Sequence, residues 1–352
     1  MKNINLEKND YISSYKFARL SDVVYSEVLT ENQYNEINPK DHTVISRGKN
    51  IVFYKLNSFS LKENDIVFCN LSLINELFKH LNKINSFKNI KIITNQTDSS
   101  ITKKIFDKKP MCVSKWYSIN IDHKDPNLIS IPLGLSNDYS PKNPNANDFI
   151  KLSSNEKITK INNMYINYQQ NTNLKERKKL FDLFKDEEWV DVDDPNLKLE
   201  EYVEKLNSYL FVFCPWGNGI ETHRVWETLY AGSVPVLKYH HSYNSISNLP
   251  VLFVGNYKEI NKKLLEEFRN EMKNKVYKFD KLSIKYWEQL INEEIIVNTT
   301  SPIEIYESKL FNLKFLIKNF IKTQANSKAK KIIYYLRQIK KVPLKITELY
   351  TK

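Results

Sequence analysis

Residues Phe211–Leu237 read FVFCPWGNGIETHRVWETLYAGSVPVL and are the most informative part of this chain. They hold three of the six glycines among 352 residues, at positions 217, 219 and 232. Glycine is used where the backbone takes a positive φ or approaches another group closely. An apolar run is followed by a glycine-rich turn, a helical pattern, a glycine and a second apolar run. This order predicts a βαβ unit of an α/β fold, with a ligand-facing loop at the carboxyl end of its first strand.

Local patterns predict each element of this unit. Residues 209–214 (YLFVFC) form a continuous apolar run, which is typical of a parallel strand buried on both faces, and Pro215 ends it. The helix is expected over residues 223–231, with Thr222 as its N-cap, and the next strand over residues 234–237. Backbone N–H groups at the start of such a helix favour an anion such as phosphate.

Two charged residues lie three positions apart in this helix. Arg224 and the amides of the preceding loop offer positive charge and hydrogen-bond donors to a diphosphate, whereas Glu227 can accept hydroxyl groups of a ribose. Glu221, Thr222 and His223 lie where a phosphate would meet the helix, and His223 either donates to a leaving diphosphate or stays neutral beside it. The alternative is an ordinary surface pair of Arg224 and Glu227, worth about 0.2–0.5 kcal/mol.

The stretch resembles the donor-binding half of exostosin-like glycosyltransferases, which have the GT-B architecture of two Rossmann-like domains facing a cleft. The motifs that carry the resemblance are Cys214-Pro215, Gly217-Asn218-Gly219, His223-Arg224-Val225-Trp226-Glu227, Ala231-Gly232, Val234-Pro235-Val236 and Leu249-Pro250-Val251-Leu252-Phe253-Val254. Residues 129–135 look like the strand and turn between the two halves, so the resemblance covers about residues 90–255. Fucosyltransferases share a similar strand-loop-helix layout, but their Glu-Asn-Ser loop is absent here.

The resemblance implies a hexosyl- or pentosyltransferase. It would move a sugar from a nucleoside-diphosphate donor to a hydroxyl of a glycan or lipid-linked glycan, with inversion and with neither a metal nor a cofactor. The donor would bind the C-terminal half, and the acceptor the N-terminal half. The implied donor-binding residues are Asn167, Thr172, Arg177, Trp216, Gly217, Asn218, Gly219, Glu221, Thr222 and Glu227. Arg224 and His223 are the catalytic candidates in this half.

The catalytic base is expected in the N-terminal half, because inversion needs a base for the acceptor hydroxyl across the cleft. Residues 94–98 (TNQTD) follow a predicted strand and lie where related bacterial and viral chains show a His-Asn-Ser-Asp-like motif. Thr94 stands in place of the histidine, so Asp98 is the candidate base. An aspartate in a surface turn is the alternative.

Apolar runs alternate with helical patterns along the rest of the chain, which predicts parallel sheets covered by helices. Strands are expected at residues 51–54, 65–69, 90–94, 116–119, 128–133 and 164–168. Helices are expected at residues 71–81, 99–106, 174–184 and 197–206. The turn-rich segment 137–148 is the expected linker. We therefore predict an acceptor domain at 1–148, a donor domain at 149–300 and a basic amphipathic helical tail at 301–352.

Positive charge is concentrated near the end of the chain. The formal net charge is +12, and residues 311–352 carry eleven Lys or Arg against one acid, Glu348. Apolar residues recur there at helical spacing, which favours an anionic membrane surface as a partner. A solvated helix that packs on its own domain is the equal alternative, and nucleic acid is the weaker one. These residues also suit a non-catalytic polyanion- or membrane-binding protein built on a degenerate transferase fold.

Other motifs are set aside. Asp191-Val192-Asp193 spells a DxD metal motif but is expected in a loop after a short strand, and His240-His241 lacks a third ligand at metal spacing. Three separated cysteines predict neither a disulfide framework nor a CxxC metal site. There is neither a signal-peptide pattern nor an apolar run of 18 residues. The expected location is the cytoplasm, with possible peripheral attachment to the inner face of the cell membrane.

Overall fold

The computed structural model describes residues 6–139, 142–154, 158–293, 301–307, 315 and 317. Contacts divide the chain into two compact units, residues 1–305 and 306–352. The basic tail expected at residues 311–352 lies outside the described residues, except for Phe315 and Ile317. Within the part of the chain that the structure describes, no helix has the length and apolar character that a membrane crossing needs.

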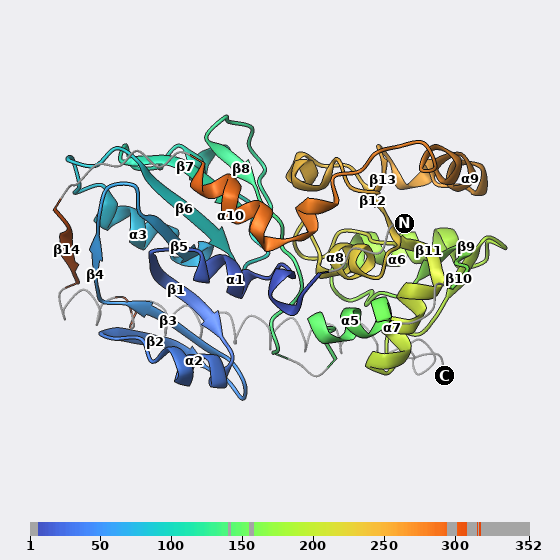
Figure 1. Ribbon diagram of the computed structural model, residues 1–352, viewed down its shortest axis with the longest axis horizontal. Coiled ribbons are helices and arrows are strands. Elements are labelled where there is room, and N and C mark those ends of the chain that lie inside the picture. Colours follow the sequence, from blue (N-terminus) through green and yellow to red (C-terminus); the bar gives the residue numbers. More distant parts are fainter. Residues whose placement is uncertain are drawn as a thin grey trace, which may run out of the picture. The chain divides into compact units, whose positions relative to one another are not determined.

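The N-terminal half of the first unit contains a seven-stranded sheet (Figure 1). Its strands run in the order β2 (His42–Arg47), β3 (Val52–Leu56), β1 (Val23–Leu29), β5 (Ile66–Asn70), β6 (Ile90–Asn95), β7 (Val113–Ser118) and β8 (Leu128–Ser130). Pairing is parallel from β1 through β8, but β3 pairs antiparallel with both β1 and β2. The sheet is therefore mixed, and the expectation of a parallel strand at residues 51–54 was wrong.

The antiparallel edge follows from a hairpin that the sequence pattern concealed. Gly48 N donates to Ile51 O across the turn between β2 and β3, so the chain reverses within a few residues. The burial of β2 does not alternate, because its residues are half-buried or exposed throughout. Sequence reasoning therefore missed β2, and it also missed β1 and β4 (Ser58–Leu61).

The second sheet lies in the C-terminal half and is parallel throughout. Its order is β10 (Val190–Val192), β9 (Ile161–Ile166), β11 (Tyr209–Phe213), β12 (Val234–Lys238) and β13 (Leu252–Val254). Numbered along the chain, this order is 2-1-3-4-5, which is a doubly wound topology. The chain adds strands on one side of β9 and then on the other, so the strand order reverses between β9 and β11. The predicted α/β class with two Rossmann-like halves is thus confirmed.

Helices cover both sheets, and those expected at residues 71–81, 99–106, 174–184, 197–206 and 223–231 are present with small shifts of their ends, whereas the others were not predicted. The helices are α1 (Ser14–Arg19), α2 (Glu31–Ile37), α3 (Ile74–Leu81), α4 (Lys103–Phe106), α5 (Ala146–Ser154), α6 (Leu174–Phe184), α7 (Leu199–Ser208), α8 (His223–Tyr230), α9 (Lys262–Glu271) and α10 (Ile284–Asn292). Short 3₁₀ turns are η1 (Lys8–Asp10), η2 (Leu71–Leu73), η3 (His241–Ile246), η4 (Tyr257–Glu259) and η5 (Phe279–Leu282), and β14 (Ile303–Tyr306) follows. The boundary expected at residue 148 falls inside α5, which contacts α7 of the C-terminal half.

The chain returns from the C-terminal half to the N-terminal sheet through α10 (Figure 1). The buried Lys91 of β6 donates to the carbonyl of Ile291 near the end of this helix, at 2.5 Å. Tyr230, the last residue of α8, receives the amide of Ile12 at 3.0 Å and donates to the carbonyl of Leu282 at 2.9 Å. The segments around Ile12 and Leu282, near the two ends of the first unit, are therefore hydrogen-bonded to the same side chain, Tyr230.

Glu221 makes a further link between the two halves. Its side chain is 3% exposed, and its Oε1 accepts from Leu133 N at 2.9 Å and from Trp226 Nε1 at 2.6 Å. Its Oε2 is buried without a hydrogen-bond partner. Burial raises the pKa of Glu221 to about 7, although both hydrogen bonds act in the opposite direction.

We expect the free energy of unfolding to depend on this carboxyl between pH 5 and pH 8. Because its pKa is higher in the folded state, its favourable contribution is complete below pH 4.5 and is lost as the pH rises through 7. Compared with the Glu221→Gln variant, the wild type should lose about 2–3 kcal/mol of stability between pH 5 and pH 8. Urea unfolding of both proteins at pH 5 and at pH 8 measures this difference. A free energy of unfolding that changes equally with pH in the wild type and in the variant would contradict the prediction.

Candidate active site

A cavity of about 400 Å³ lies between the two halves, at the carboxyl ends of their parallel strands. In the C-terminal half it opens where the strand order reverses, because its lining comes from the loops that follow β9 and β11. In an open α/β sheet, this crevice is the usual position of a ligand. The opposite wall comes from the loops after β6, β7 and β8.

Two glycines of the Gly217-Asn218-Gly219 loop are explained by close approach rather than by a positive φ. A Cβ at Gly219 would lie 2.8 Å from Asn120 Nδ2 and 3.4 Å from Asp98 Cα, both in the N-terminal half. A Cβ at Gly217 would lie 3.2 Å from Nη2 of Arg177. A side chain at Gly219 would therefore displace Asn120 of the opposite wall, and one at Gly217 would press on the Arg177 guanidinium.

Arg177 of α6 binds the backbone at the start of the glycine loop through its guanidinium group. Its guanidinium donates to the carbonyls of Pro215 at 3.0 Å, Trp216 at 2.8 Å and Gln169 at 3.0 Å, and to Thr172 Oγ1 at 2.5 Å. The side chain lines the cavity but is 7% exposed. Burial and the charge of nearby Arg224 lower the pKa of Arg177 to about 10, so it remains a cation at neutral pH. Most of its donors are thus used to join the loops after β9 and β11.

The start of α8 keeps polar groups without partners. Thr222 occupies the predicted N-cap position, but its hydroxyl makes no capping bond, and its buried Oγ1 has no hydrogen-bond partner. Nη1 of Arg224 is likewise buried without a partner. Unpaired donors at a helix N-terminus, where the dipole also favours negative charge, form a local environment suited to an anion.

Arg224 belongs to a charged cluster behind this helix start. Its guanidinium lies 5.2 Å from the ring centre of Tyr202, whose hydroxyl donates to Glu227 Oε2 at 2.6 Å. Burial acts to lower the pKa of Arg224, but Tyr202, Glu227, Cys214 and Tyr165 together outweigh it and raise that pKa. Glu227 is 8% exposed, so it is not the surface residue that an exposed Arg–Glu pair would require. Its role as a ribose ligand stays a prediction.

His223 and Asp98 lie on opposite walls of the cavity. Nδ1 of His223 is 2.8 Å from the carbonyl of Gly134. A carbonyl only accepts, so this nitrogen carries a proton, and Nε2 of the neutral ring is left as an acceptor. His223 therefore donates to an anion through Nε2 only as an imidazolium. Asp98 is exposed in the loop after β6, so a substrate that enters the cavity from solvent can contact its carboxylate.

The structure brings most of the predicted site residues together around this cavity. Those that line it are Asp98, Thr172, Arg177, Gly217, Asn218, Gly219, Glu221, Thr222 and His223. Four others are not among its lining residues: Asn167, Trp216, Arg224 and Glu227. The buried Asn167 instead donates to Asp194 O at 2.8 Å, and Trp216 Nε1 faces Lys238 O at 3.3 Å. Arg224 and Glu227 form the cluster behind α8.

Sequence reasoning missed the asparagines of the N-terminal wall. Asn70 and Asn95 end β5 and β6, and Asn120 lies two residues beyond β7. All three are buried, and Asn95 and Asn120 line the cavity. Asn120 Oδ1 accepts the Glu221 amide at 2.8 Å, whereas Asn95 Nδ2 is buried without a partner. The recurring pattern of an asparagine at the end of a buried apolar run (IVFCN, IKIITN, WYSIN) was the available signal.

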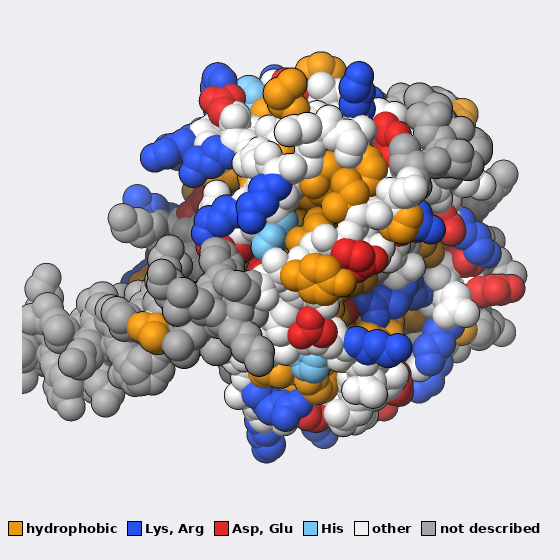
Figure 2. Space-filling model, turned by 90° about the vertical axis from the view of Figure 1, so that its left-hand side faces the viewer, with side chains coloured by type: hydrophobic (Ala, Val, Ile, Leu, Met, Phe, Trp, Pro, Cys, Tyr) orange, Lys and Arg blue, Asp and Glu red, His pale blue; other side chains and the backbone are white. Residues whose placement is uncertain are grey.

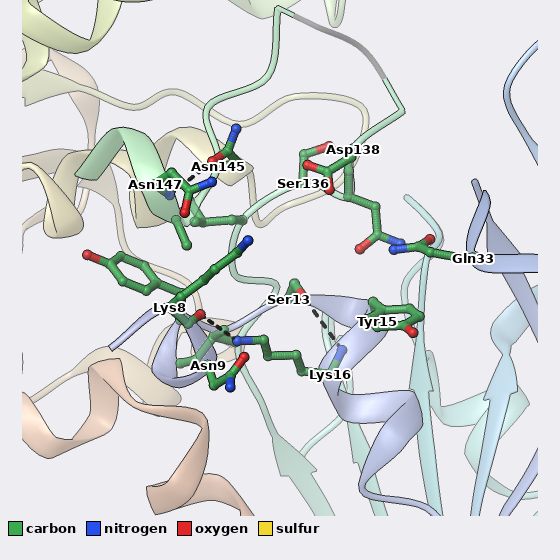
Figure 3. Close-up of a pocket in the computed structure, with 15 residues that line it drawn as sticks. Lys8, Asn9, Ser13, Tyr15, Lys16, Gln33, Ser136, Asp138, Asn145 and Asn147 are labelled. Carbon is green, nitrogen blue, oxygen red and sulfur yellow. Dashed lines mark hydrogen bonds between the residues drawn. The ribbon is translucent and has the colours of Figure 1, made fainter. Parts of the chain in front are cut away.

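A second cavity, of about 350 Å³, adjoins the first and shares Ser136 and Asn137 with it. In Figure 3, Ser136, Asp138 and Gln33 lie on one side of this cavity, and Lys8, Asn145 and Asn147 lie on the other. Tyr15 and Lys16 add an aromatic ring and a cation. Half-burial lowers the pKa of Lys16 to about 8, although the Asp10 charge acts to raise it.

The DxD residues have structural partners. Asp191 lies in β10, not in a loop as expected, and its Oδ2 accepts from Asn163 Nδ2 at 3.2 Å. Asp193 Oδ2 accepts from the Tyr165 hydroxyl at 3.0 Å and lies 3.1 Å from Lys205 Nζ. These carboxylates therefore bind side chains of neighbouring elements at the edge of the second sheet. The three cysteines are buried as free thiols.

No family model matches the chain. No curated protein matches it either. Among solved structures, the chain is similar to an α1,3-fucosyltransferase with GDP-fucose, at 14% identity and a TM-score of 0.33 over 64% of this chain and 81% of that one. It is also similar to a second α1,3-fucosyltransferase structure, at 13% identity and a TM-score of 0.34 over 74% of this chain and 78% of that one.

Proposed function

We propose that the protein is a glycosyltransferase that binds a nucleoside-diphosphate sugar in the 400 Å³ cavity and transfers the sugar to a glycan hydroxyl. The observation that carries the proposal is the start of α8, where Thr222 Oγ1, at the cavity, is buried without a partner. Arg224 Nη1 is also buried without a partner, although Arg224 lies behind the residues that line the cavity. Leaving a buried donor unsatisfied costs about 1–3 kcal/mol, more when it is charged. A diphosphate in the cavity would give the Thr222 hydroxyl a partner, would place negative charge in front of Arg224 and would meet the positive end of the helix.

Electrostatic stabilisation of the leaving group is the main chemical step that these residues support. As the bond from the sugar to the diphosphate breaks, negative charge grows on the diphosphate, and Arg224 with the α8 amides would stabilise it. Arg177 acts through the loop, because its donors hold the backbone of residues 215 and 216. Asp98, on the opposite wall, would accept the proton of the acceptor hydroxyl.

The second cavity is our candidate for the acceptor. It continues from the first through Ser136 and Asn137, and amide side chains, hydroxyls and Tyr15 line it. Such groups exchange hydrogen bonds with sugar hydroxyls, and an aromatic ring packs on the apolar face of a sugar. The exostosin-like resemblance favours this division of donor and acceptor between the halves. Membrane attachment through residues 311–352, which would suit a lipid-linked acceptor, remains a further proposal.

The alternative of a non-catalytic polyanion-binding protein is less well supported. Residues 311–352 account for about +10 of the net charge of +12, so the rest of the chain is nearly balanced. On the face that Figure 2 shows, Lys and Arg side chains are interspersed with Asp and Glu among the described residues. A surface that binds a polyanion concentrates one sign of charge, so in this alternative residues 311–352, rather than the face shown, would bind it.

Calorimetry with UDP, GDP, CDP and dTDP tests the proposal and also separates a fucosyltransferase-like donor preference from others. We expect one of these nucleotides to bind with a stoichiometry of one. The matching nucleotide sugars then serve as donors in transfer and hydrolysis assays. If none of the four nucleotides binds to the folded protein, the non-catalytic alternative is favoured.

Arg224→Ala should lower turnover with the preferred donor by about 10²-fold or more, because charge stabilisation of the leaving group is lost. Arg224→Lys keeps the charge without the planar fork and should recover only part of the activity. Lys179→Ala removes an exposed cation from α6 and should behave as the wild type. Near-normal transfer by Arg224→Ala protein that is folded by circular dichroism would refute this role.

Glu227→Gln should weaken nucleoside-diphosphate binding by about 1–3 kcal/mol if this carboxylate binds the ribose. Affinity for inorganic pyrophosphate, which has no ribose, should not change. Tyr202→Phe is the matched control, because it removes only the hydroxyl that donates to Glu227. Titration calorimetry measures both ligands, and equal nucleotide affinities for all three proteins would assign Glu227 to a structural pair with Tyr202.

Asp98→Asn should reduce transfer by about 10²–10⁴-fold, which is the typical contribution of a general base. Nucleotide affinity should remain that of the wild type, because the base acts on the acceptor. Asp107→Asn, in an exposed ion pair with Lys103, controls for the loss of one surface carboxylate. A variant that transfers normally would show Asp98 to be a surface-turn residue.

A further inference from the structure

Three potential metal ligands meet at the seam between the two halves of the first unit. Asp122 follows β7, whereas His240 and His241 follow β12. One ligand atom from each residue lies within 4.8 Å of the ligand atoms of the other two. Nε2 of His240 lies 3.4 Å from Oδ1 of Asp122. The third ligand that is missing near His240-His241 in the sequence is thus supplied by the other half of the fold.

The hydrogen-bonding state of His241 leaves one nitrogen available. Nε2 of His241 is buried and has no hydrogen-bond partner, a state that costs free energy in the absence of a ligand. Nδ1 of His240 accepts the Ser242 amide at 3.2 Å, so the neutral ring carries its proton on Nε2, beside Asp122. For Nε2 to bind a metal, this proton must move to Nδ1, which would then donate to Ser242 Oγ, 3.1 Å away, in place of the amide contact. The two rings are stacked, with centroids 4.2 Å apart.

Two lysines near the cluster oppose a bound cation. Lys124 and Lys238 both act electrostatically on His240, so the Asp122 carboxylate is needed to offset their charge.

We propose that Asp122, His240 and His241 bind a divalent transition-metal ion such as Zn²⁺, which fastens the two halves of the first unit together. Two imidazoles and a carboxylate are ligands that zinc accepts, with water in the fourth position. The ion would strengthen an existing joint, where Ser242 Oγ donates to the Ile121 carbonyl at 2.7 Å and the Ser130 hydroxyl donates to Ser242 O.

The site is separate from the proposed donor cavity but lies close to its glycine loop. None of the three ligands is among the residues that line either cavity. The Trp216 ring, at the start of the loop, meets the edge of His240 with centroids 5.6 Å apart and an angle of 89°. A metal at this position would therefore restrain Trp216 through His240, and it would do so whether or not the protein is a transferase.

Metal titration of the chelator-treated, full-length protein tests the proposal. We expect one Zn²⁺ to bind per chain by calorimetry and to raise the melting temperature by a few degrees, since it binds only the folded state. Co²⁺ in place of Zn²⁺ should give the visible absorption of a bound ion with nitrogen ligands. No saturable binding of either ion would overturn the proposal.

Ligand variants establish where the ion binds. Asp122→Asn, His240→Asn and His241→Asn should each lower Zn²⁺ affinity by at least about tenfold. Asp122 is half exposed, so its variant should fold even if a histidine variant does not, and circular dichroism checks this. His123→Asn, which changes a neighbouring histidine packed on Phe106, should bind as the wild type. If the three ligand variants bind Zn²⁺ as the wild type does, the ion binds adventitiously elsewhere and the site is refuted.

Discussion

The close approach of Gly219 to Asn120 and Asp98 is the constraint on which the cleft depends. The loops after β11, β7 and β6 meet there, and a methyl group in place of the glycine hydrogen would lie 2.8 Å from Asn120 Nδ2. Asn120 then accepts the amide of Glu221, and Glu221 accepts the amide of Leu133. A chain of short contacts thus fixes the separation of the two walls. The two walls come this close because Gly219 has no side chain and its backbone packs against the Asn120 side chain and the Asp98 backbone.

The two arginines of the C-terminal half differ because of what surrounds them. Arg177 gives its donors to three carbonyls and one hydroxyl, so its charge is used to hold together the loops on both sides of the strand-order reversal. Arg224 lies on the aromatic face of Tyr202 and keeps Nη1 unpaired. Burial and, to a smaller extent, the charge of Arg224 lower the pKa of Arg177. An anion in the cavity would offset both effects.

Local patterns in the sequence predicted the C-terminal half well because each of its elements is specified by neighbours in the chain. The apolar run at 209–214, the glycine loop and the helical spacing of α8 each require only nearby residues, and Gly232 has the positive φ, 67°, expected where a helix ends. The β2–β3 hairpin was not predicted, since its strands are neither fully buried nor alternating. The approach of Asp122 to His240 also could not be predicted from the sequence, because it depends on how the two halves of the first unit pack.

Several unsatisfied polar groups gather at the cleft, although they are not confined to it. Glu221 Oε2, Thr222 Oγ1, Asn95 Nδ2 and Arg224 Nη1 are all buried without partners, and the first three belong to residues that line the cavity. Other buried unpaired atoms, such as His241 Nε2 and Ser245 Oγ, lie away from this cavity, whereas the Ser233 hydroxyl is engaged by the carbonyls of Leu206 and Tyr209. Each unpaired group lowers the stability of the free protein, and a ligand that pairs with it recovers that free energy on binding. A molecule of the same shape without the complementary polar atoms would leave these groups unpaired, so the same feature that weakens the free protein provides selectivity among ligands.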